Sequence, residues 1–99
     1  MYFIILAEDK ADSLPVRMKC RPAHLAYAAT QGCVVLAGPL LTAGDDPKPR
    51  GSMLIINVVD QAAAENFAAR DPYALAGLFA RVDIHPWTPA FGDWKPEEV

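Results

Sequence analysis

Two continuous apolar runs constrain this chain of 99 residues more than any other feature of its sequence. The first run covers residues 2–7, the second covers residues 53–59, and both are rich in residue types that favour strands. Such runs predict strands that are covered on both faces, as central strands of a sheet are. A chain of this length forms one domain, so we expect both strands in the same sheet.

Two further segments are predicted strands, and each carries a feature typical of a sheet edge. Residues 33–41 contain Gly38 and Pro39, and proline is tolerated in sheets mainly at an edge or a bulge. Residues 80–87 alternate between apolar and polar or charged side chains. The polar, proline-rich segment 42–50 predicts a mobile loop. We therefore expect these two strands to flank the two apolar ones.

The first long helix is predicted to end at Gly32 and to begin at Pro22, after a short helical turn over residues 14–18. Proline suits the first helical position, and glycine suits the residue that follows a helix. Because an internal proline removes a hydrogen bond, the chain either kinks or restarts at Pro22. A restart places His24 in a first turn, where the helix dipole favours a neutral imidazole that can accept a proton.

Asp60 is a good N-cap for a second helix over residues 61–70, and Asp71 can cap a short helix over residues 72–79. The order is therefore strand, helix, strand, strand, helix, strand, which is a βαββαβ arrangement of the α+β class. We expect a four-stranded antiparallel sheet. Right-handed crossovers place both helices on the same face of it.

Two helices leave the other face of the sheet uncovered. Of the chain's residues, 53 % are hydrophobic, and one small core cannot easily bury that much apolar surface. We therefore expect a two-fold homodimer that packs the helix-free sheet faces together and buries more than roughly 2,000 Å² in total. The tail over residues 88–99 carries Phe91 and Trp94, and we expect it to form a packed arm.

Charge and cysteine usage exclude several classes of function. The net charge is -3 and the basic residues form no run, so no nucleic-acid partner is expected. Cys20 and Cys33 are isolated, and with two histidines they compose no metal site. No cofactor is expected. The apolar start is too short to span a bilayer and lacks a basic leader, so we expect no membrane partner and a reducing, cytoplasmic location.

Several short motifs occur along the chain in a specific combination. They are Arg17, Arg21-Pro22-Ala23-His24-Leu25-Ala26-Tyr27, Ala37-Gly38-Pro39-Leu40, Gly51-Ser52, Asp71-Pro72-Tyr73, Ala76-Gly77-Leu78-Phe79 and Val82-Asp83-Ile84-His85-Pro86-Trp87. In this combination the chain resembles the YCII-related family over nearly its whole length, as a single domain over residues 1–99. The resemblance implies a ferredoxin-like fold assembled as a dimeric α+β barrel, related in architecture to muconolactone isomerases.

The resemblance also implies a site in which His24 and Asp71 work together. Chemistry attributed to the family includes dehydrochlorination of aromatic intermediates, which implies proton transfer leading to elimination or isomerisation. A carboxylate on one imidazole nitrogen would fix the tautomer and raise the basicity of the other nitrogen. An aspartate before proline is also a routine helix cap, so the two roles are compatible only if the carboxylate reaches both groups.

Five further residues are candidates for substrate binding, and each has a structural alternative. Arg21 offers a planar fork of hydrogen-bond donors to a carboxylate or phenolate of the substrate. Alternatively, it is a surface residue or the ion-pair partner of Asp71. Ser52 either donates a hydrogen bond to a ligand or to the imidazole, or it only begins a strand. Gly38 and Pro39 either let the backbone approach a ligand or form an edge bulge. Tyr73 lines an apolar pocket or packs in the core.

We therefore expect a small lyase or isomerase in which a histidine moves a proton on a small, cyclic or anionic metabolite. The alternative is a non-catalytic module that binds a metabolite in the same pocket, as a sensor or as an accessory to another enzyme. A third interpretation leaves the pocket filled by side chains.

Overall fold

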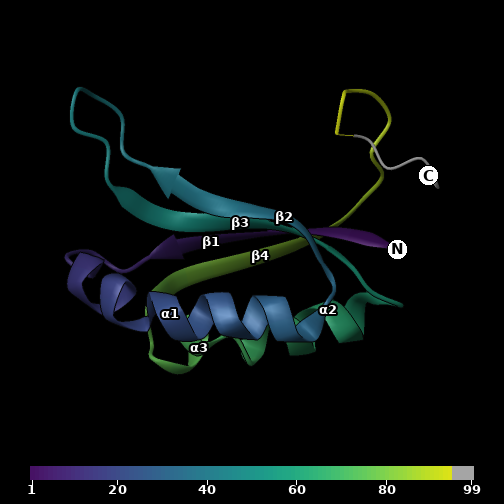
Figure 1. Cartoon of the computed structure of the whole chain (residues 1–99), viewed down its shortest axis with the longest axis horizontal. Coiled ribbons are helices and arrows are strands. Elements are labelled where there is room, and N and C mark those ends of the chain that lie inside the picture. The colour runs from purple at the N-terminus through teal and green to yellow at the C-terminus, as the bar shows by residue number, and fades with distance from the viewer. Residues whose placement is uncertain (95–99) are drawn as a thin grey trace.

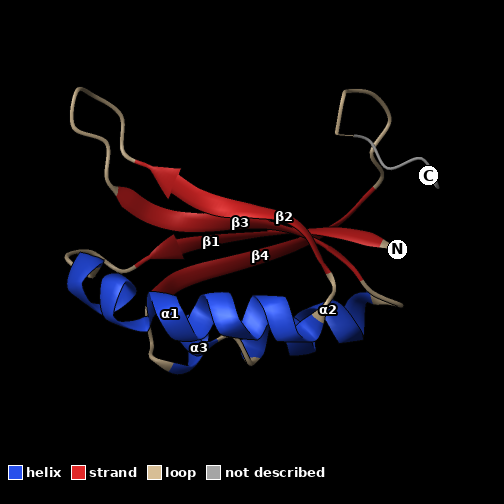
Figure 2. Ribbon diagram, in the orientation of Figure 1, coloured by secondary structure: helices blue, strands red, loops and turns tan. Residues whose placement is uncertain are grey.

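The computed structural model describes residues 1–94, which form a four-stranded antiparallel sheet with its helices on one face (Figures 1 and 2). In chain order, the elements are β1 (Tyr2–Asp9), α1 (Leu14–Gln31), β2 (Val34–Leu41), β3 (Pro49–Asn57), α2 (Gln61–Ala69), α3 (Pro72–Leu75) and β4 (Phe79–Trp87). The strand order is β2-β3-β1-β4. The two apolar runs therefore form the central strands, and the predicted ferredoxin-like βαββαβ fold is confirmed.

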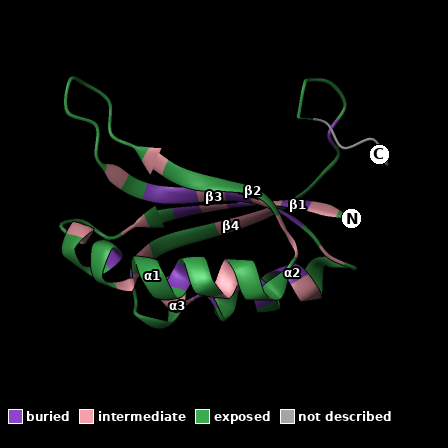
Figure 3. Cartoon of the chain, in the orientation of Figure 1, coloured by how far each residue is buried: buried purple, intermediate pink, exposed green. Residues whose placement is uncertain are grey.

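The core lies between the sheet and the helices because burial alternates along the central strands (Figure 3). Phe3, Ile5 and Ala7 of β1 are buried, whereas the residues between them are only partly buried on the opposite face. Ile56 of β3 and Phe67 of α2 complete this buried layer. The core is consequently one-sided, and the helix-free face of the sheet has no cover within the described chain.

Helix α1 runs from Leu14 to Gln31 with Pro22 inside it, so the restart that the sequence left open at Pro22 is wrong and the alternative, a continuous helix with a kink, is present. Pro22 lies inside it and cannot donate a hydrogen bond to the carbonyl of Met18, a defect that costs about 3 kcal/mol. The ribbon bends after its first turns (Figure 1). His24 therefore lies well inside a long helix, so the predicted first-turn electrostatics do not apply to it. The helix continues through Pro22 because tertiary contacts hold side chains on both sides of the proline.

Two other boundaries differ from the prediction for local reasons. Strand β3 already begins at Pro49, because the hairpin closes through a 2.9 Å hydrogen bond from the Thr42 N–H to the Lys48 carbonyl. Helix α3 has a single turn and ends before the predicted residue 79, since Gly77 has a φ of 74°. The helix caps follow the sequence more closely, with Gly32 left-handed after α1.

Residues 88–94 leave the sheet on the side opposite the helices (Figure 1). Phe91 is 98 % exposed and Trp94 is 81 % exposed, so these aromatics do not pack against the described chain as the prediction required. Residues 95–99, the end of the predicted arm, lie outside the described residues. The hairpin over residues 42–48 projects on the same side (Figure 1). None of the helices in residues 1–94 is long and apolar enough to cross a membrane.

Candidate active site

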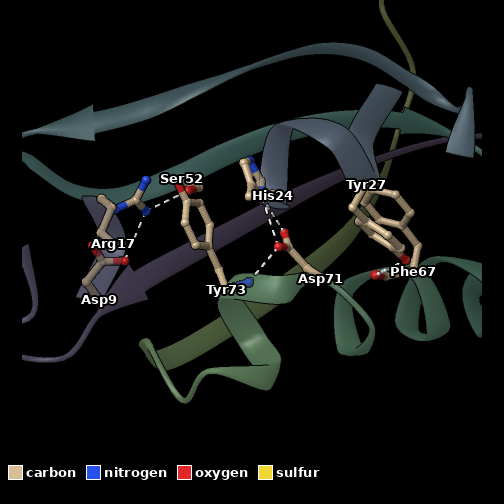
Figure 4. A network of polar contacts seen from close by, with 8 residues as sticks. All are labelled: Asp9, Arg17, His24, Tyr27, Ser52, Phe67, Asp71 and Tyr73. Carbon is tan, nitrogen blue, oxygen red and sulfur yellow. Dashed lines mark hydrogen bonds and ion pairs between the residues drawn. The ribbon is translucent and has the colours of Figure 1, made fainter. Parts of the chain in front are cut away.

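His24 and Asp71 meet where α1 faces the start of α3 (Figure 4). Both side chains are buried, and Nδ1 of His24 lies 2.9 Å from each carboxylate oxygen of Asp71. Because an ionised carboxylate only accepts hydrogen bonds, Nδ1 carries the hydrogen in this contact. The neutral ring then has its lone pair on Nε2, which points away from Asp71 (Figure 4). The predicted contact between the two residues is therefore present.

Asp71 serves two donors at once. Its Oδ1 also accepts the Tyr73 backbone N–H at 2.9 Å, which makes Asp71 the N-cap of α3. The two roles that the sequence left as alternatives, helix cap and partner of His24, are thus held by the same carboxylate. Because the cap ties this carboxylate to its own backbone, the imidazole meets an acceptor that is already in position.

The Tyr73 ring stands between two cationic or basic groups (Figure 4). It stacks on the His24 imidazole with ring centroids 4.0 Å apart, and the guanidinium carbon of Arg17 lies 4.6 Å from its centroid. Burial raises the pKa of the Tyr73 phenol, while the positive charges of Arg17 and Arg21 act in the opposite direction. The Tyr73 hydroxyl therefore stays protonated at neutral pH.

Arg17 is a site residue that the interpretation of the sequence missed. Its Nε and Nη2 donate to the Asp9 carboxylate at 2.7 and 3.0 Å, and Nη2 also donates to Ser52 Oγ at 2.7 Å. Arg17, Arg21 and His24 have i, i+4, i+7 spacing, which places them on one face of a continuous helix. This signal was available in the sequence, but the predicted interruption of the helix concealed it.

A cavity of about 370 Å³ opens between α1 and strands β2 and β3, and Arg17 is among the residues that line it. Its lining includes every predicted site residue except Asp71, namely Arg21, His24, Gly38, Pro39, Ser52 and Tyr73. Asp71 reaches the cavity through its contact with His24. A cavity of this volume suits a small molecule, so the interpretation in which side chains fill the pocket is not supported.

The structure also decides between some of the alternatives for single residues. Arg21 is exposed where it lines the cavity, and within residues 1–94 it forms no ion pair with Asp71. Gly38 and Pro39 pair in register with Met53 and Ser52, so the bulge expected as one alternative is absent at these two residues. No cluster of three or more histidine, cysteine, aspartate or glutamate side chains in the described chain is arranged to hold a metal ion.

The fold and the site together define a small ferredoxin-like α+β protein with a buried histidine–carboxylate pair beside a cavity of ligand size. Residues 1–88 match the YCII-related domain, and the chain belongs to this family.

Relatives of known sequence or structure agree with this assignment. Protein YciI of Escherichia coli O6:H1 (strain CFT073) is 37 % identical over 98 residues, which cover 92 % of this chain and 100 % of that protein. The 5-chloro-2-hydroxyhydroquinone dehydrochlorinase TftG of Burkholderia phenoliruptrix AC1100, solved with 2,5-dihydroxybenzoquinone, has a TM-score of 0.83 and 32 % identity, with 97 % of this chain and 100 % of that chain covered. An antibiotic biosynthesis monooxygenase shares the fold alone, with a TM-score of 0.52 and 12 % identity over 90 % of this chain and 100 % of that chain.

Proposed function

We propose that this protein is a cytosolic, cofactor-independent enzyme in which His24 transfers a proton on a small oxygen-bearing ring compound, with elimination or isomerisation as the result. The contact between His24 Nδ1 and the Asp71 carboxylate carries this proposal. It leaves Nε2, which has no hydrogen-bond partner within residues 1–94, as the proton acceptor of a side chain that lines a cavity of ligand size. The free thiols of Cys20 and Cys33 fit a reducing compartment.

The chemistry follows from the state of the imidazole. In an elimination, Nε2 takes a hydrogen of the substrate as a proton, the electron pair of the broken bond forms a double bond, and the leaving group departs with its own bonding pair. In an isomerisation, the same proton returns to a different atom. Asp71 stabilises the imidazolium that forms in either case, and a base positioned in this way accelerates proton transfer by about 10²–10⁴-fold.

The relation to TftG favours elimination over isomerisation. TftG is a dehydrochlorinase of a chlorinated hydroxyhydroquinone, and its structure holds a dihydroxybenzoquinone. Loss of hydrogen chloride needs a base for the proton and a path for the chloride. The exposed guanidinium of Arg21, which also lines the cavity, provides a positive charge for an anionic oxygen or a departing anion.

A non-catalytic sensor or accessory module remains the second candidate, and one observation favours it. The Asp71 carboxylate caps α3, so its burial beside His24 has a structural cause that needs no chemistry. In this case the same cavity binds a metabolite without turnover.

Release of chloride from 5-chloro-2-hydroxyhydroquinone tests the enzymatic proposal. We expect the wild-type protein to release chloride, His24→Gln to be inactive, and Lys19→Gln, which changes an exposed residue of the same helix outside the cavity lining, to match the wild type. Binding of 2,5-dihydroxybenzoquinone without chloride release by the wild-type protein would favour the sensor. Nitrogen-15 NMR of the imidazole provides a readout that needs no ligand, and we expect the hydrogen of neutral His24 on Nδ1.

We also propose that two copies associate through the helix-free face of the sheet. Ile4 and Ile55 are neighbours across β1 and β3 on this face, and both are only partly buried. Phe91 and Trp94 project beside it, and a hollow of about 670 Å³ separates this tail from the sheet. A second copy would cover the apolar strands and both aromatics, which residues 1–94 of one chain leave exposed to water.

A further inference from the structure

The cavity beside His24 differs in chemistry between its two ends. At one end, Arg17 of α1 donates to Ser52 Oγ of β3 at 2.7 Å. Further along the same helix, Tyr27 packs against the core cluster that contains Ile56 of β3. α1 and β3 therefore advance in the same direction along the cavity. The arginines of α1 lie toward one end of it, and the residues that follow His24 lie toward the other.

The end of the cavity that is remote from the arginines is apolar. It is lined by Leu25, Ala37 and Leu54, which we call the apolar end. Leu54 and Ala37 are neighbours in register across β3 and β2, and Leu25 comes from α1. Leu54 is 3 % exposed, whereas Leu25 is 46 % exposed. A ligand that covers the exposed part of Leu25 removes apolar surface from water, which favours its binding.

Ala37 determines how much room the apolar end has. Its side chain is a single methyl group, and the residue is exposed on the edge strand β2. Packing of the core therefore does not require a small side chain at this residue. A longer side chain there would extend into the cavity and occupy the space beside Leu54. The room at this end thus depends on one alanine that the fold itself does not need.

We propose that Leu25, Ala37 and Leu54 form a specificity subsite for a halogen atom or a methyl group on the ring of the substrate. This inference rests on the proposed function and names the substrate class of that site. The ring carries its anionic or polar oxygen toward the arginines and an apolar substituent on the side away from them. A hydrophobic pocket distinguishes ligands that differ by one group of this size by about 10-fold or more.

The position of His24 gives this subsite a role in the reaction as well as in binding. The imidazole lies between the arginines and the apolar end, and all of these groups line one cavity. A ring that is held at both ends cannot rotate freely, so it presents one edge to Nε2. The apolar end therefore helps to select which ring position loses its proton.

Calorimetric binding of three probes tests the subsite. The probes are 2,5-dihydroxybenzoquinone and its 3-chloro and 3-methyl derivatives. Chlorine and methyl are similar in size but change the acidity of the ring hydroxyls differently, so a gain for both identifies an apolar contact. We expect the wild-type protein to bind both derivatives about 10-fold more tightly than the parent compound.

Substitutions at the apolar end should change this gain and not only the overall affinity. Ala37→Leu should abolish the gain because leucine fills the subsite, and Ala37→Val should reduce it. Leu25→Ala should also reduce it, because the substituent loses its contact on α1. Both residues are exposed, so we expect these variants to fold. Val16→Ala truncates an exposed apolar residue of α1 outside the cavity lining and should keep the full gain.

The outcomes separate this inference from the proposed function. Equal affinity of the wild type for the three probes, a gain for the chlorinated probe alone, no binding of any probe, or a full gain in Ala37→Leu would overturn the subsite. Chloride release from 5-chloro-2-hydroxyhydroquinone decides the proton transfer separately. Tighter binding of both derivatives together with no chloride release by the wild type would support the subsite and refute the proton transfer.

Discussion

At Asp71 a single carboxylate accepts hydrogen bonds from two parts of the chain, the imidazole of His24 and the first turn of α3. The two contacts have different requirements. The helix cap needs only an oxygen acceptor, which asparagine also provides. The imidazole needs a negative charge when it becomes protonated. Substitutions at this residue can therefore separate the stability of the fold from the chemistry of the site.

Asp71→Asn should lower the rate of chloride release by about 10²–10⁴-fold, because the imidazolium loses its counter-charge. The melting temperature should change little, since asparagine is about as good a cap as aspartate. Asp71→Ala should lose the same activity and about 1 kcal/mol of unfolding free energy as well. Full activity in Asp71→Asn would contradict the role assigned to the pair.

We expect Tyr73 to make the free energy of unfolding depend on pH in the alkaline range. Burial raises the pKa of its phenol, whereas a solvent-exposed tyrosine, as in the unfolded chain, ionises at about pH 10. Above that pH the unfolded state loses a proton that the folded state keeps, so stability is fully present below pH 10 and falls as pH rises. We expect urea unfolding to show this loss in the wild type and a smaller loss in Tyr73→Phe. Equal pH dependence in both proteins would refute the assignment.

Among the elements, the strands were predictable and the long helix was not. Continuous apolar runs and the Gly38-Pro39 break are local signals, so the sheet order followed from them. The continuity of α1 depends on contacts distant in sequence, such as the 2.9 Å bond from the Tyr27 hydroxyl to the Phe67 carbonyl. Local rules place a helix start at Pro22. Such local rules do not include long-range contacts such as those of Arg17, whose hydrogen-bond partners lie on β1 and β3.

The close approach of the β1 and β3 backbones allows a prediction about the stability of the sheet. A Cβ on Gly51 would clash with the Ala7 backbone carbonyl oxygen and come within 3.2 Å of Leu40. Gly51→Ala should therefore lower the unfolding free energy by about 1–3 kcal/mol, because backbone must move to admit the methyl group. Gly38→Ala is the control, since a Cβ there meets nothing within 4 Å. Urea unfolding of both variants measures the difference, and equal stabilities would contradict the predicted clash.

For the whole molecule, the one-sided core is the feature with the widest consequences. The sequence predicted an apolar helix-free face, and the partly buried Ile4 and Ile55 lie side by side on it. The position of the tail was not predictable. Its aromatics Phe91 and Trp94 find no partner in residues 1–94, and the single chain holds no information about a surface that a second copy would supply.

Sedimentation equilibrium tests the association. A chain of 10.7 kDa should sediment with twice that mass, and Ile55→Lys should sediment as a monomer because it places a charge in the proposed interface. Val59→Lys is the matched control, since Val59 is 81 % exposed after β3, and it should remain dimeric. A wild-type protein that is monomeric at all concentrations would refute the proposed dimer.

The strand order interleaves the two halves of the chain. β1 and β2 belong to the first half, yet β3 from the second half lies between them, and β1 in turn separates β3 from β4. Neither half alone can therefore form a paired sheet, and each carries only one member of the His24–Asp71 contact. If the backbone were cut within residues 42–48, we expect two fragments that do not fold on their own. Recovery of the nitrogen-15 NMR signal of the His24 imidazole bound to Asp71 on mixing would report their reassembly.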